Sequence, residues 1–269
     1  MKYELIDGVG LPKVGFGTWS IGGRSWADRS SDKKSLAALR SALVLGYRHF
    51  DTAEMYAAGH AEELLGQAVR DVGVRREQLF LTSKVLPEHL RYAEVLKACD
   101  RSLRRLGVDY LDIYLIHWPN RHIPLTETFR ALNQLVEGGR VRRIGVSNFD
   151  LNLLEEARKL SATPMFTDQV PFSLRDRTYA HNGVLQYCQD NDILLTAYTP
   201  FEKGGLRVKA NLASISRVHA ATPHQIALAW LLAQPRVVAI PMSQDPGHQQ
   251  ENLAAADIEL SPADMAELN

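Results

Sequence analysis

The chain has 269 residues, which fits one α/β barrel of roughly 250 residues or two smaller domains. Hydrophobic residues make up 45% of it and charged residues 23%, a balance typical of a soluble globular protein with a substantial core. The 31 Lys and Arg residues equal the 31 Asp and Glu residues, so the charge gives no indication of binding to nucleic acid or to an acidic membrane surface.

The chain begins with a stretch, residues 3–13, whose Asp7-Gly8 dipeptide is typical of a tight hairpin turn. After it, short apolar runs alternate with amphipathic segments. Nearly continuous apolar runs suit parallel strands that are buried on both faces. We expect eight strands, at residues 14–17, 48–51, 79–83, 111–116, 143–147, 166–170, 193–198 and 237–240.

Between these runs lie segments with apolar residues at helical spacing. They are residues 35–45, 60–72, 93–106 and 126–136, with a further one at 262–268. Glycine follows each of the first four within two residues, as is common where helices end. Thr126, Asp150 and Thr222 are expected N-caps. Alternating strands and helices imply right-handed βαβ units and a parallel sheet, and eight such units close more naturally as a barrel than as an open sheet. The sequence therefore predicts one domain over residues 1–269, an α/β fold of the (β/α)8 TIM barrel type with an N-terminal β-hairpin cap.

Polar side chains stand at the ends of successive expected strands. They are Asp51, Lys84 and His117, spaced 33 residues apart, then Ser147-Asn148, Gln169 and Tyr198. Each one alone suits a solvated turn or, for the histidine, a buried structural role. In (β/α)8 barrels, however, the chemistry lies at the carboxyl ends of the strands. The common position of these residues predicts an active site at one mouth of the barrel.

Four of these residue types suit proton transfer to a carbonyl oxygen. Tyr56 follows Asp51 by five residues, in the loop after the second expected strand. A free phenol has a pKa of about 10, and an adjacent ammonium lowers it. Lys84 can supply that ammonium, with Asp51 holding it in place, and His117 can donate a hydrogen bond to a substrate oxygen. The set has no nucleophile–base pair, so acyl transfer is less natural.

Other chemistries lack the residues that they need. The nine histidines form no His-Glu-x-x-His or His-x-His pattern and there is no Cys-x-x-Cys, so no metal site is expected. There is also no Walker A sequence. Gly15 and Gly17 begin like a dinucleotide-binding glycine fingerprint, but the third glycine is missing. A dinucleotide that binds this chain is therefore not expected to use a Rossmann turn.

The cellular setting follows from what the sequence lacks. Cys99 and Cys188 are too few for a disulfide framework, and we expect both to be free thiols. The first thirteen residues show no basic region followed by an apolar one, as a secretory signal has. No apolar run approaches the ~18 residues of a membrane span. We expect a cytoplasmic protein with no membrane or nucleic-acid partner.

Three blocks of the sequence resemble the aldo-keto reductase family, in the family's order. They are residues 46–56 (GYRHFDTAEMY), 111–119 (LDIYLIHWP) and 144–149 (IGVSNF). The resemblance runs from Gly15 to Asn252. It implies a catalytic tetrad of Asp51, Tyr56, Lys84 and His117, in which Tyr56 is the general acid of carbonyl reduction.

The resemblance also implies an extended nicotinamide cofactor, NADPH or NADH, across the barrel mouth. The expected cofactor contacts are Gly17, Thr18, Trp19, Asp51, Ser147, Asn148, Gln169, Tyr198, Thr199, Pro200, Phe201, Gly204, Pro241, Met242, Ser243, His248, Glu251 and Asn252. Within this set, Ser147, Asn148 and Gln169 hold the carboxamide and Tyr198 stacks on the nicotinamide ring. The expected substrate contacts are Trp19, Tyr56, His117 and Trp118, and core packing is the alternative for Trp118.

The segment that faces the adenine end departs from the family. Its usual pattern is Pro-Lys-Ser, four residues, Arg, two residues and Glu-Asn, whereas here Met242 replaces the Lys and His248 replaces the Arg. A methionine cannot pair with a 2′-phosphate, and a neutral histidine pairs weakly. We therefore expect use of NADH, or of both cofactors, in place of a strict NADPH preference. Lys203 or Arg207, after the seventh strand, are alternative partners for the phosphate.

The expected substrate is a small carbonyl compound. The chain stops at Asn269 without the C-terminal tail of many relatives, and the loop at residues 118–126 is short. A shallow, open pocket is expected from this, one that accepts small aldehydes, α-dicarbonyls or sugars in a monomer or weak homodimer. Two alternatives stay open: a non-catalytic nicotinamide-sensing subunit of the same fold, and a barrel lyase that uses Lys84 as a Schiff base. The intact tetrad argues against the first and Asp51, which raises the pKa of Lys84, against the second.

Overall fold

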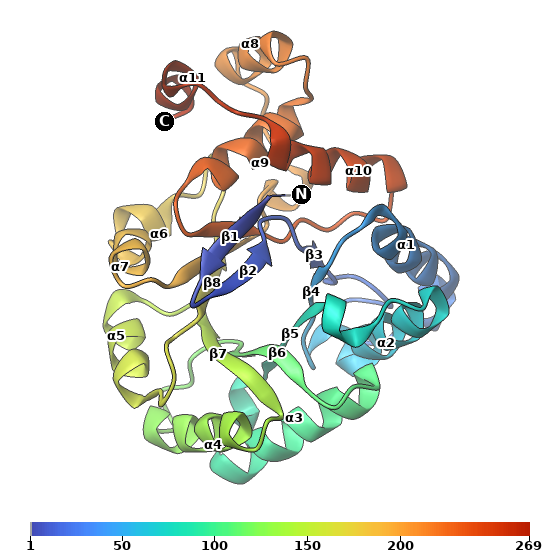
Figure 1. Ribbon diagram of the computed structural model, residues 1–269, viewed down its shortest axis with the longest axis vertical. Coiled ribbons are helices and arrows are strands. Elements are labelled where there is room, and N and C mark those ends of the chain that lie inside the picture. The colour runs from blue at the N-terminus through green and yellow to red at the C-terminus, as the bar shows by residue number, and fades with distance from the viewer. Residues whose placement is uncertain (1) are drawn as a thin grey trace.

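The computed structural model describes residues 2–269, except for the side chain of Lys203. A curled sheet of parallel strands occupies the centre of the molecule, and helices surround it (Figure 1). The strands are neighbours in chain order, each paired in parallel with the next. They are β3 (Phe16–Gly17), β4 (His49–Asp51), β5 (Phe80–Val85), β6 (Leu111–Ile116), β7 (Val141–Ser147), β8 (Thr167–Pro171), β9 (Leu194–Tyr198) and β10 (Val237–Ala239).

The two edges of the sheet are joined by backbone hydrogen bonds. Val14 pairs in parallel with Ala239, and the N–H of Gly15 donates to the oxygen of Ala239 at 2.8 Å. One step further, the N–H of Gly17 donates to the oxygen of Pro241 at 3.2 Å. The eight strands therefore follow the arrangement of a (β/α)8 fold, with all their carboxyl ends on one side. The expected parallel sheet with alternating helices is confirmed.

A two-stranded hairpin covers the end of the sheet opposite to the carboxyl ends of the strands. Strands β1 (Tyr3–Ile6) and β2 (Val9–Pro12) are antiparallel, and their turn uses left-handed backbone at Asp7 and Gly8, with φ of 47° and 69°. This is the conformation that an Asp-Gly turn favours. The hairpin lies over the middle of the sheet in Figure 1, and its inner side chains form one buried cluster with inward-facing strand residues. The cluster comprises Ile6, Leu11, Ile113, Leu115, Phe166, Leu194 and Val238.

The hairpin lies at the amino ends of the strands. Arg236, directly before β10, donates to Glu4 and to the backbone oxygen of Leu5 on β1. The expected hairpin cap is therefore present, and it leaves the carboxyl ends of the strands as the open mouth of the sheet.

The helices are α1 (Asp32–Leu45), α2 (His60–Val72), α3 (Tyr92–Leu106), α4 (Leu125–Glu137), α5 (Leu151–Leu160), α6 (Thr178–His181), α7 (Val184–Asp190), α8 (Ala210–Val218), α9 (Pro223–Ala233), α10 (Pro246–Ala254) and α11 (Pro262–Leu268). Most of them pack around the outside of the sheet, and α8 and α11 lie beyond α9 (Figure 1). Short 3-10 turns lie at Arg29–Ser31, Tyr56–Gly59, Arg76–Gln78, Pro87–His89, Glu202–Gly204 and Ala255–Asp257. None of these helices, within residues 2–269, is long and apolar enough to cross a membrane.

The expected N-caps hold at two positions of three. Asp150 accepts from the N–H of Leu153, and Thr222 forms a reciprocal capping box with Gln225. Thr126 is not a cap, because α4 begins at Leu125 and Pro124 is the residue before it. The extended backbone of Pro124 starts the helix two residues early, with no side-chain cap hydrogen bond.

Other boundaries differ from expectation by a few residues. Strand β5 continues to Val85, so Lys84 lies within the strand and not after its end.

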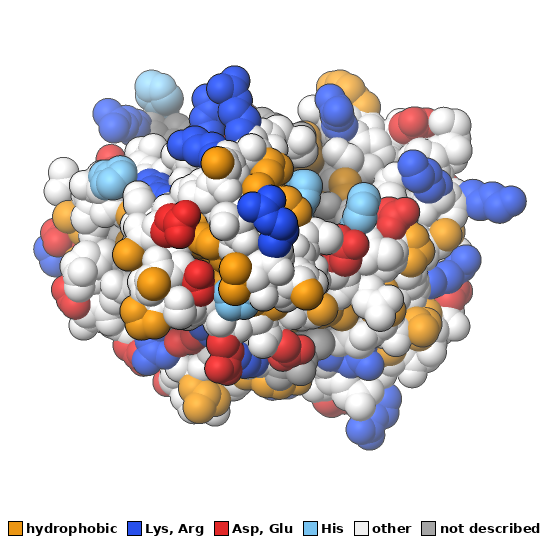
Figure 2. Space-filling model, turned by 90° about the horizontal axis from the view of Figure 1, so that it is seen from above, with side chains coloured by type: hydrophobic (Ala, Val, Ile, Leu, Met, Phe, Trp, Pro, Cys, Tyr) orange, Lys and Arg blue, Asp and Glu red, His pale blue; other side chains and the backbone are white. Residues whose placement is uncertain are grey.

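Cys99 and Cys188 are both buried and free, as expected. On the face shown in Figure 2, basic and acidic side chains are interspersed, in keeping with the zero net charge.

Candidate active site

Four polar side chains meet at the carboxyl ends of β4, β5 and β6. The ammonium of Lys84 lies 2.5 Å from Oδ1 of Asp51, 2.9 Å from the oxygen of Thr52 and 3.1 Å from the hydroxyl of Tyr56. The ring of His117 packs edge-on against Tyr56, with centroids 5.6 Å apart. Lys84 and Asp51 are essentially inaccessible to solvent. The structure thus brings together the four residues that the sequence singled out.

The phenol of Tyr56 is held by an unusual turn. Ala57 and Ala58, which follow it, both have left-handed backbone with φ of 51° and 53°. Alanine rarely adopts this conformation, and it persists only where surrounding contacts enforce it. Here the N–H of Ala57 donates to the oxygen of Arg24 at 2.5 Å, and Ala57 is fully buried. The strained turn fixes the direction of Tyr56 toward Lys84.

Burial and charge act on the tetrad in opposite directions. Burial raises the pKa of Tyr56, and the Lys84 ammonium opposes this without reversing it. The sequence predicted a lowered pKa for Tyr56, and this prediction is wrong. Burial removes the phenolate from water, and this raises the pKa more than the neighbouring ammonium lowers it. For Lys84, burial favours loss of the proton, yet the charges of Asp51 and Tyr56 raise its pKa overall, so it stays charged.

His117 is neutral in this setting. Burial and the nearby Lys84 ammonium lower the pKa of its imidazole to about 2. A neutral ring has one N–H to donate, and Nδ1 of His117 is buried without a partner in the described part of the chain. The ring stacks on Trp118, with centroids 3.9 Å apart. Trp118 is half-buried at the mouth, so the alternative of core packing does not describe it.

A second polar network adjoins the tetrad at the ends of β7, β8 and β9. The amide of Gln169 donates to Oδ2 of Asp51 at 2.7 Å, which links the two groups. The hydroxyl of Ser147 donates to the backbone oxygen of Gln169, and the amide of Asn148 donates to Ser147. The hydroxyl of Tyr198 donates to Oδ1 of Asn148 at 2.7 Å. These four expected cofactor contacts therefore form one connected group.

The expected contacts at the end of β3 and directly after it lie beside the same mouth. Trp19 is 38% exposed, and its ring packs edge-on against Tyr56 at 5.1 Å. Thr18 is buried, and its hydroxyl has no partner within the described residues. A Cβ on Gly17 would lie 2.7 Å from the oxygen of Ile240, so only glycine lets the first and last strands approach this closely.

The remaining expected contacts come from the loops after β9 and β10. Thr199, Pro200, Phe201 and Gly204 follow β9, and Pro241, Met242, Ser243, His248, Glu251 and Asn252 lead from β10 into α10. Of the two alternative partners for the phosphate, Arg207 is exposed. The side chain of Lys203 lies outside the described residues. The segment from Pro241 to Asn252 starts at the mouth, since Pro241 accepts the hydrogen bond from Gly17.

Sequence reasoning missed three polar residues near these groups. Gln249 is fully buried, and Asp245 is the N-cap of α10. An Asp before Pro at the start of a helical segment is a recognisable cap signal, and it was available in the sequence. Asp168 had no such signal, because it lies on β8 next to Gln169 in a strand that is buried on both faces.

Asp168 is an uncompensated buried carboxyl. It is inaccessible to solvent, and neither oxygen has a well-formed hydrogen bond within the described residues. Burial raises its pKa well above the usual value, with the N–H of Phe149 opposing the shift. Such a group destabilises the folded state at pH values above its unfolded pKa of about 4, and the cost grows as pH rises toward the folded-state pKa.

Asp168→Asn should therefore stabilise the protein, by about 1–3 kcal/mol at pH 8 and by less at pH 5, because the amide carries no charge to desolvate. Urea denaturation at the two pH values measures this. Asp190→Asn, at an exposed helix end, is the matched control and should change little at either pH. An equal effect of Asp168→Asn at both pH values would show that the carboxyl is not the source.

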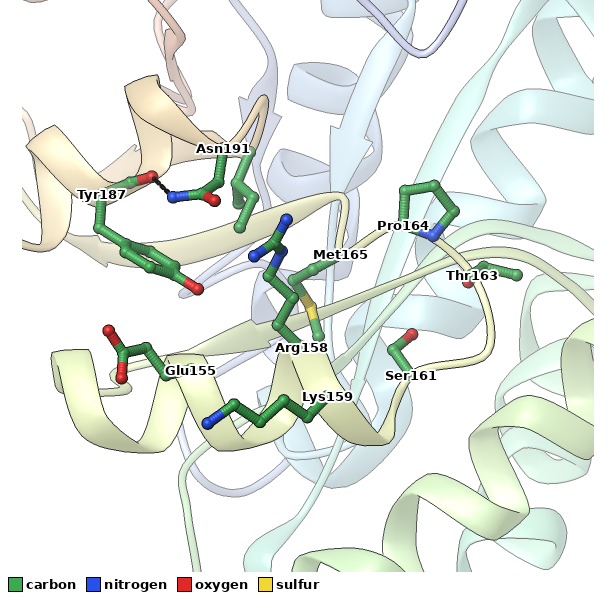
Figure 3. A pocket seen from close by; sticks show the side chains of 10 residues that line it. Glu155, Arg158, Lys159, Ser161, Thr163, Pro164, Met165, Tyr187 and Asn191 are labelled. Atoms are coloured by element: carbon green, nitrogen blue, oxygen red, sulfur yellow. Dashed lines mark hydrogen bonds between the residues drawn. The ribbon is translucent and has the colours of Figure 1, made fainter.

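A large cavity lies elsewhere in the molecule. It has a volume of about 730 Å³ and opens between α5 and α7 (Figure 3). Glu155, Arg158 and Lys159 line one wall, Tyr187 and Asn191 the other. Met165 and Ile193, which precede β8 and β9, also line it, so it lies at the amino ends of the strands. None of the tetrad or its neighbours lines it, and the candidate active site is at the opposite end.

Known proteins match the chain along its whole length. The model described as "Aldo/keto reductase family" matches residues 13–269. The methylglyoxal reductase YeaE of Escherichia coli is 38% identical, over 100% of this chain and 95% of that protein. A crystal structure of a thermostable aldo-keto reductase in complex with the inhibitor epalrestat has a TM-score of 0.96 and 45% identity, covering 100% of this chain and 98% of that one. An aldo/keto reductase from Klebsiella pneumoniae, in complex with NADP and acetate, has a TM-score of 0.89 and 37% identity, covering 99% and 94%.

Proposed function

Because the chain belongs to the aldo/keto reductase family, we propose that this oxidoreductase reduces small aldehydes and ketones to alcohols, with Tyr56 as the proton donor. The observation that carries the proposal is the position of the Lys84 ammonium, between the Asp51 carboxylate and the Tyr56 hydroxyl. A buried phenol beside a fixed cation suits donation of a proton to a substrate oxygen on which negative charge develops.

Each member of the tetrad has one task in this scheme. Tyr56 donates its proton to the carbonyl oxygen, and the Lys84 ammonium stabilises the phenolate that is left. Asp51 keeps Lys84 charged and in place, and it is itself held by Gln169. The neutral His117 ring donates a hydrogen bond to the same substrate oxygen and orients the carbonyl. The nicotinamide cofactor, when bound, supplies the hydride.

The residues beside the tetrad suit the nicotinamide end of the cofactor. A carboxamide needs both donors and acceptors, and the side-chain amides of Asn148 and Gln169 offer both kinds of atom next to Ser147. The half-buried ring of Tyr198, fixed through Asn148, offers an apolar face for stacking. The buried Thr18 hydroxyl that lacks a partner is a further polar atom at this mouth.

The proposed substrate is a small carbonyl compound such as an α-dicarbonyl. Trp19, Tyr56 and Trp118 present aromatic surface around the tetrad, with Trp19 and Trp118 partly exposed. Aromatic walls with few charged groups suit small neutral carbonyls better than highly charged substrates. The similarity to a methylglyoxal reductase supports the same class.

The direct test follows absorbance at 340 nm with methylglyoxal and a small aromatic aldehyde, giving NADH and NADPH separately. Oxidation of either cofactor is the expected result. Cofactor binding, detected by fluorescence quenching, without turnover of any carbonyl would instead favour the nicotinamide-sensing role. Borohydride trapping of a substrate on Lys84 would favour the lyase alternative.

The adenosine end of the proposed cofactor site fits a 2′-phosphate poorly. Met242 carries no charge, and His248 is an exposed imidazole at the start of α10. Replacing both with cations, in Met242→Lys with His248→Arg, should tighten NADPH binding at least about tenfold, because each charge-assisted contact contributes about 1.5–3 kcal/mol.

Dissociation constants for NADH and NADPH measure this change. Met242→Leu with His248→Gln is the uncharged control and should leave the ratio of the two constants near its original value. An unchanged ratio in the charged variant would place phosphate recognition elsewhere, in the loop at residues 201–207.

A further inference from the structure

A buried histidine at the start of α2 lies between carboxylates from two different helices. Nδ1 of His60 is 2.7 Å from Oε2 of Glu63, three residues further along α2. Its Nε2 is 2.8 Å from Oδ1 of Asp32, the first residue of α1, and the side chain is only 6% exposed. A carboxylate only accepts hydrogen bonds, so each ring nitrogen has to carry a proton for both contacts to form. The arrangement therefore requires a charged imidazolium.

His60 directly follows the turn that directs Tyr56. Three consecutive residues with left-handed backbone, Ala57, Ala58 and Gly59, connect the two, with φ of 51°, 53° and 91°. Alanine in this conformation is strained and persists only where surrounding contacts enforce it. The contact of the imidazole ring with α1 fixes the end of the turn to a neighbouring helix, on the side away from the phenol.

The ring also supports the segment between β3 and α1. A Cβ on Gly22 would lie 2.8 Å from Cδ2 of His60, so the ring and this segment are in close contact. The same segment holds the start of the left-handed turn, because the oxygen of Arg24 accepts from the N–H of Ala57. His60 therefore lies where α1, the segment before it and the turn after Tyr56 meet.

The charges around the ring depend on its protonation. A cation in the first turn of a helix is unfavourable by itself, because the helix dipole is positive there, and Asp32 and Glu63 compensate for it. The nearest other charges are those of Arg105 on α3, which lies beside Gly59, and Glu62, which pairs with Arg105 at 2.6 Å. Once the imidazolium loses a proton, a nitrogen lone pair faces a carboxylate and that contact becomes repulsive. The contacts are therefore complete at low pH and are lost as pH rises.

We propose that His60 is a positioning residue for carbonyl reduction, in which the clamp formed by its imidazolium with Asp32 and Glu63 fixes the turn after Tyr56 and releases it as pH rises. This rests on the proposed function, in which Tyr56 donates the proton. Burial raises the pKa of Tyr56, so the phenol itself keeps its proton between pH 6 and pH 9. A loss of turnover over this range is therefore attributed to the clamp and not to the proton donor.

Glu63→Gln tests the proposal because it lets a neutral ring make both contacts. The ring then donates to Asp32 from Nε2 and accepts from the substituted amide at Nδ1, so neither contact needs the second proton. Glu156→Gln is the matched control, an exposed glutamate on α5. His60→Ala removes the clamp altogether. For each protein, kcat with methylglyoxal, the dissociation constant of the cofactor and Tm are measured at pH 6 and pH 9.

From pH 6 to pH 9 we expect kcat to fall at least about threefold in the unchanged protein and in Glu156→Gln, and to stay within about twofold in Glu63→Gln. His60→Ala should be about tenfold slower than the unchanged protein at pH 6, with cofactor binding retained, because a displaced donor slows the chemical step. An equal fall of kcat in Glu63→Gln and the unchanged protein, or full turnover of His60→Ala, overturns the positioning role.

The same measurements separate this proposal from the proposed function. A Tm that falls more steeply with pH in the unchanged protein than in Glu63→Gln, with no matching change in kcat, would make the clamp purely structural and overturn its effect on Tyr56. No turnover by the unchanged protein at either pH overturns the proposed function. In that case Tm still decides on the clamp, because an equal dependence on pH in the unchanged protein and Glu63→Gln shows that the ring is not an imidazolium.

Discussion

Tyr56→Phe should lower kcat for carbonyl reduction by about 10³-fold and leave the dissociation constant of the cofactor within about twofold. The substitution removes one oxygen, which is the proposed proton donor, and general acid catalysis typically contributes 10²–10⁴-fold. The ring, its contact with Trp19 and the strained turn behind it are unchanged. Lys84 keeps its bonds to Asp51 and to the oxygen of Thr52, so the buried charge stays paired.

Steady-state kinetics with methylglyoxal and fluorescence quenching by the cofactor separate the two effects. Tyr110→Phe is the matched control, because Tyr110 directly precedes β6 at the amino ends of the strands, and it should keep full activity. Turnover of Tyr56→Phe within tenfold of the unchanged protein would mean that another group or water delivers the proton. An equal loss of cofactor binding would mean that the phenol acts on binding and not on chemistry.

The sequence predicted three members of the tetrad because topology controls their positions at strand ends. Asp51, Lys84 and His117 recur at one βα unit apart, and parallel strands bring their carboxyl ends to one side. The structure confirms that they meet. Lys84 contacts both Asp51 and Tyr56 there, as expected from the residue types.

What the sequence could not predict depends on three-dimensional surroundings. The left-handed turn at Ala57 and Ala58 has no local signal, because alanine disfavours it and it persists through contacts of the folded chain such as the hydrogen bond to Arg24. Asp168 and Gln169 are adjacent, yet they face opposite sides of β8, and a strand buried on both faces has no alternation to distinguish them. The direction in which the pKa of Tyr56 shifts likewise depends on its burial, which only the folded structure determines.

Lys84→Met should abolish activity and also destabilise the protein by about 3–5 kcal/mol, since it leaves the Asp51 carboxylate buried with only Gln169 as a strong partner. For a chain of this size, that corresponds to a fall in Tm of about 10 °C. The informative comparison is the double variant Lys84→Met with Asp51→Asn, in which no charge is left unpaired.

The double variant should regain most of the lost stability, because a buried ion pair contributes little compared with a neutral pair of similar shape, whereas half of a pair is costly. Its activity should stay lost, because Tyr56 then has no cation to stabilise its phenolate. Thermal unfolding and turnover, measured on the same preparations, therefore separate the two tasks of Lys84. If the double variant were as unstable as Lys84→Met, packing of the lysine chain and not the charge of Asp51 would account for the loss. Burial already raises the pKa of Asp51 in the unchanged protein, with Lys84 opposing the shift. If Lys84→Met were fully stable, Asp51 would have to be protonated in that variant, and stability would then fall as pH rises through the folded-state pKa of that carboxyl.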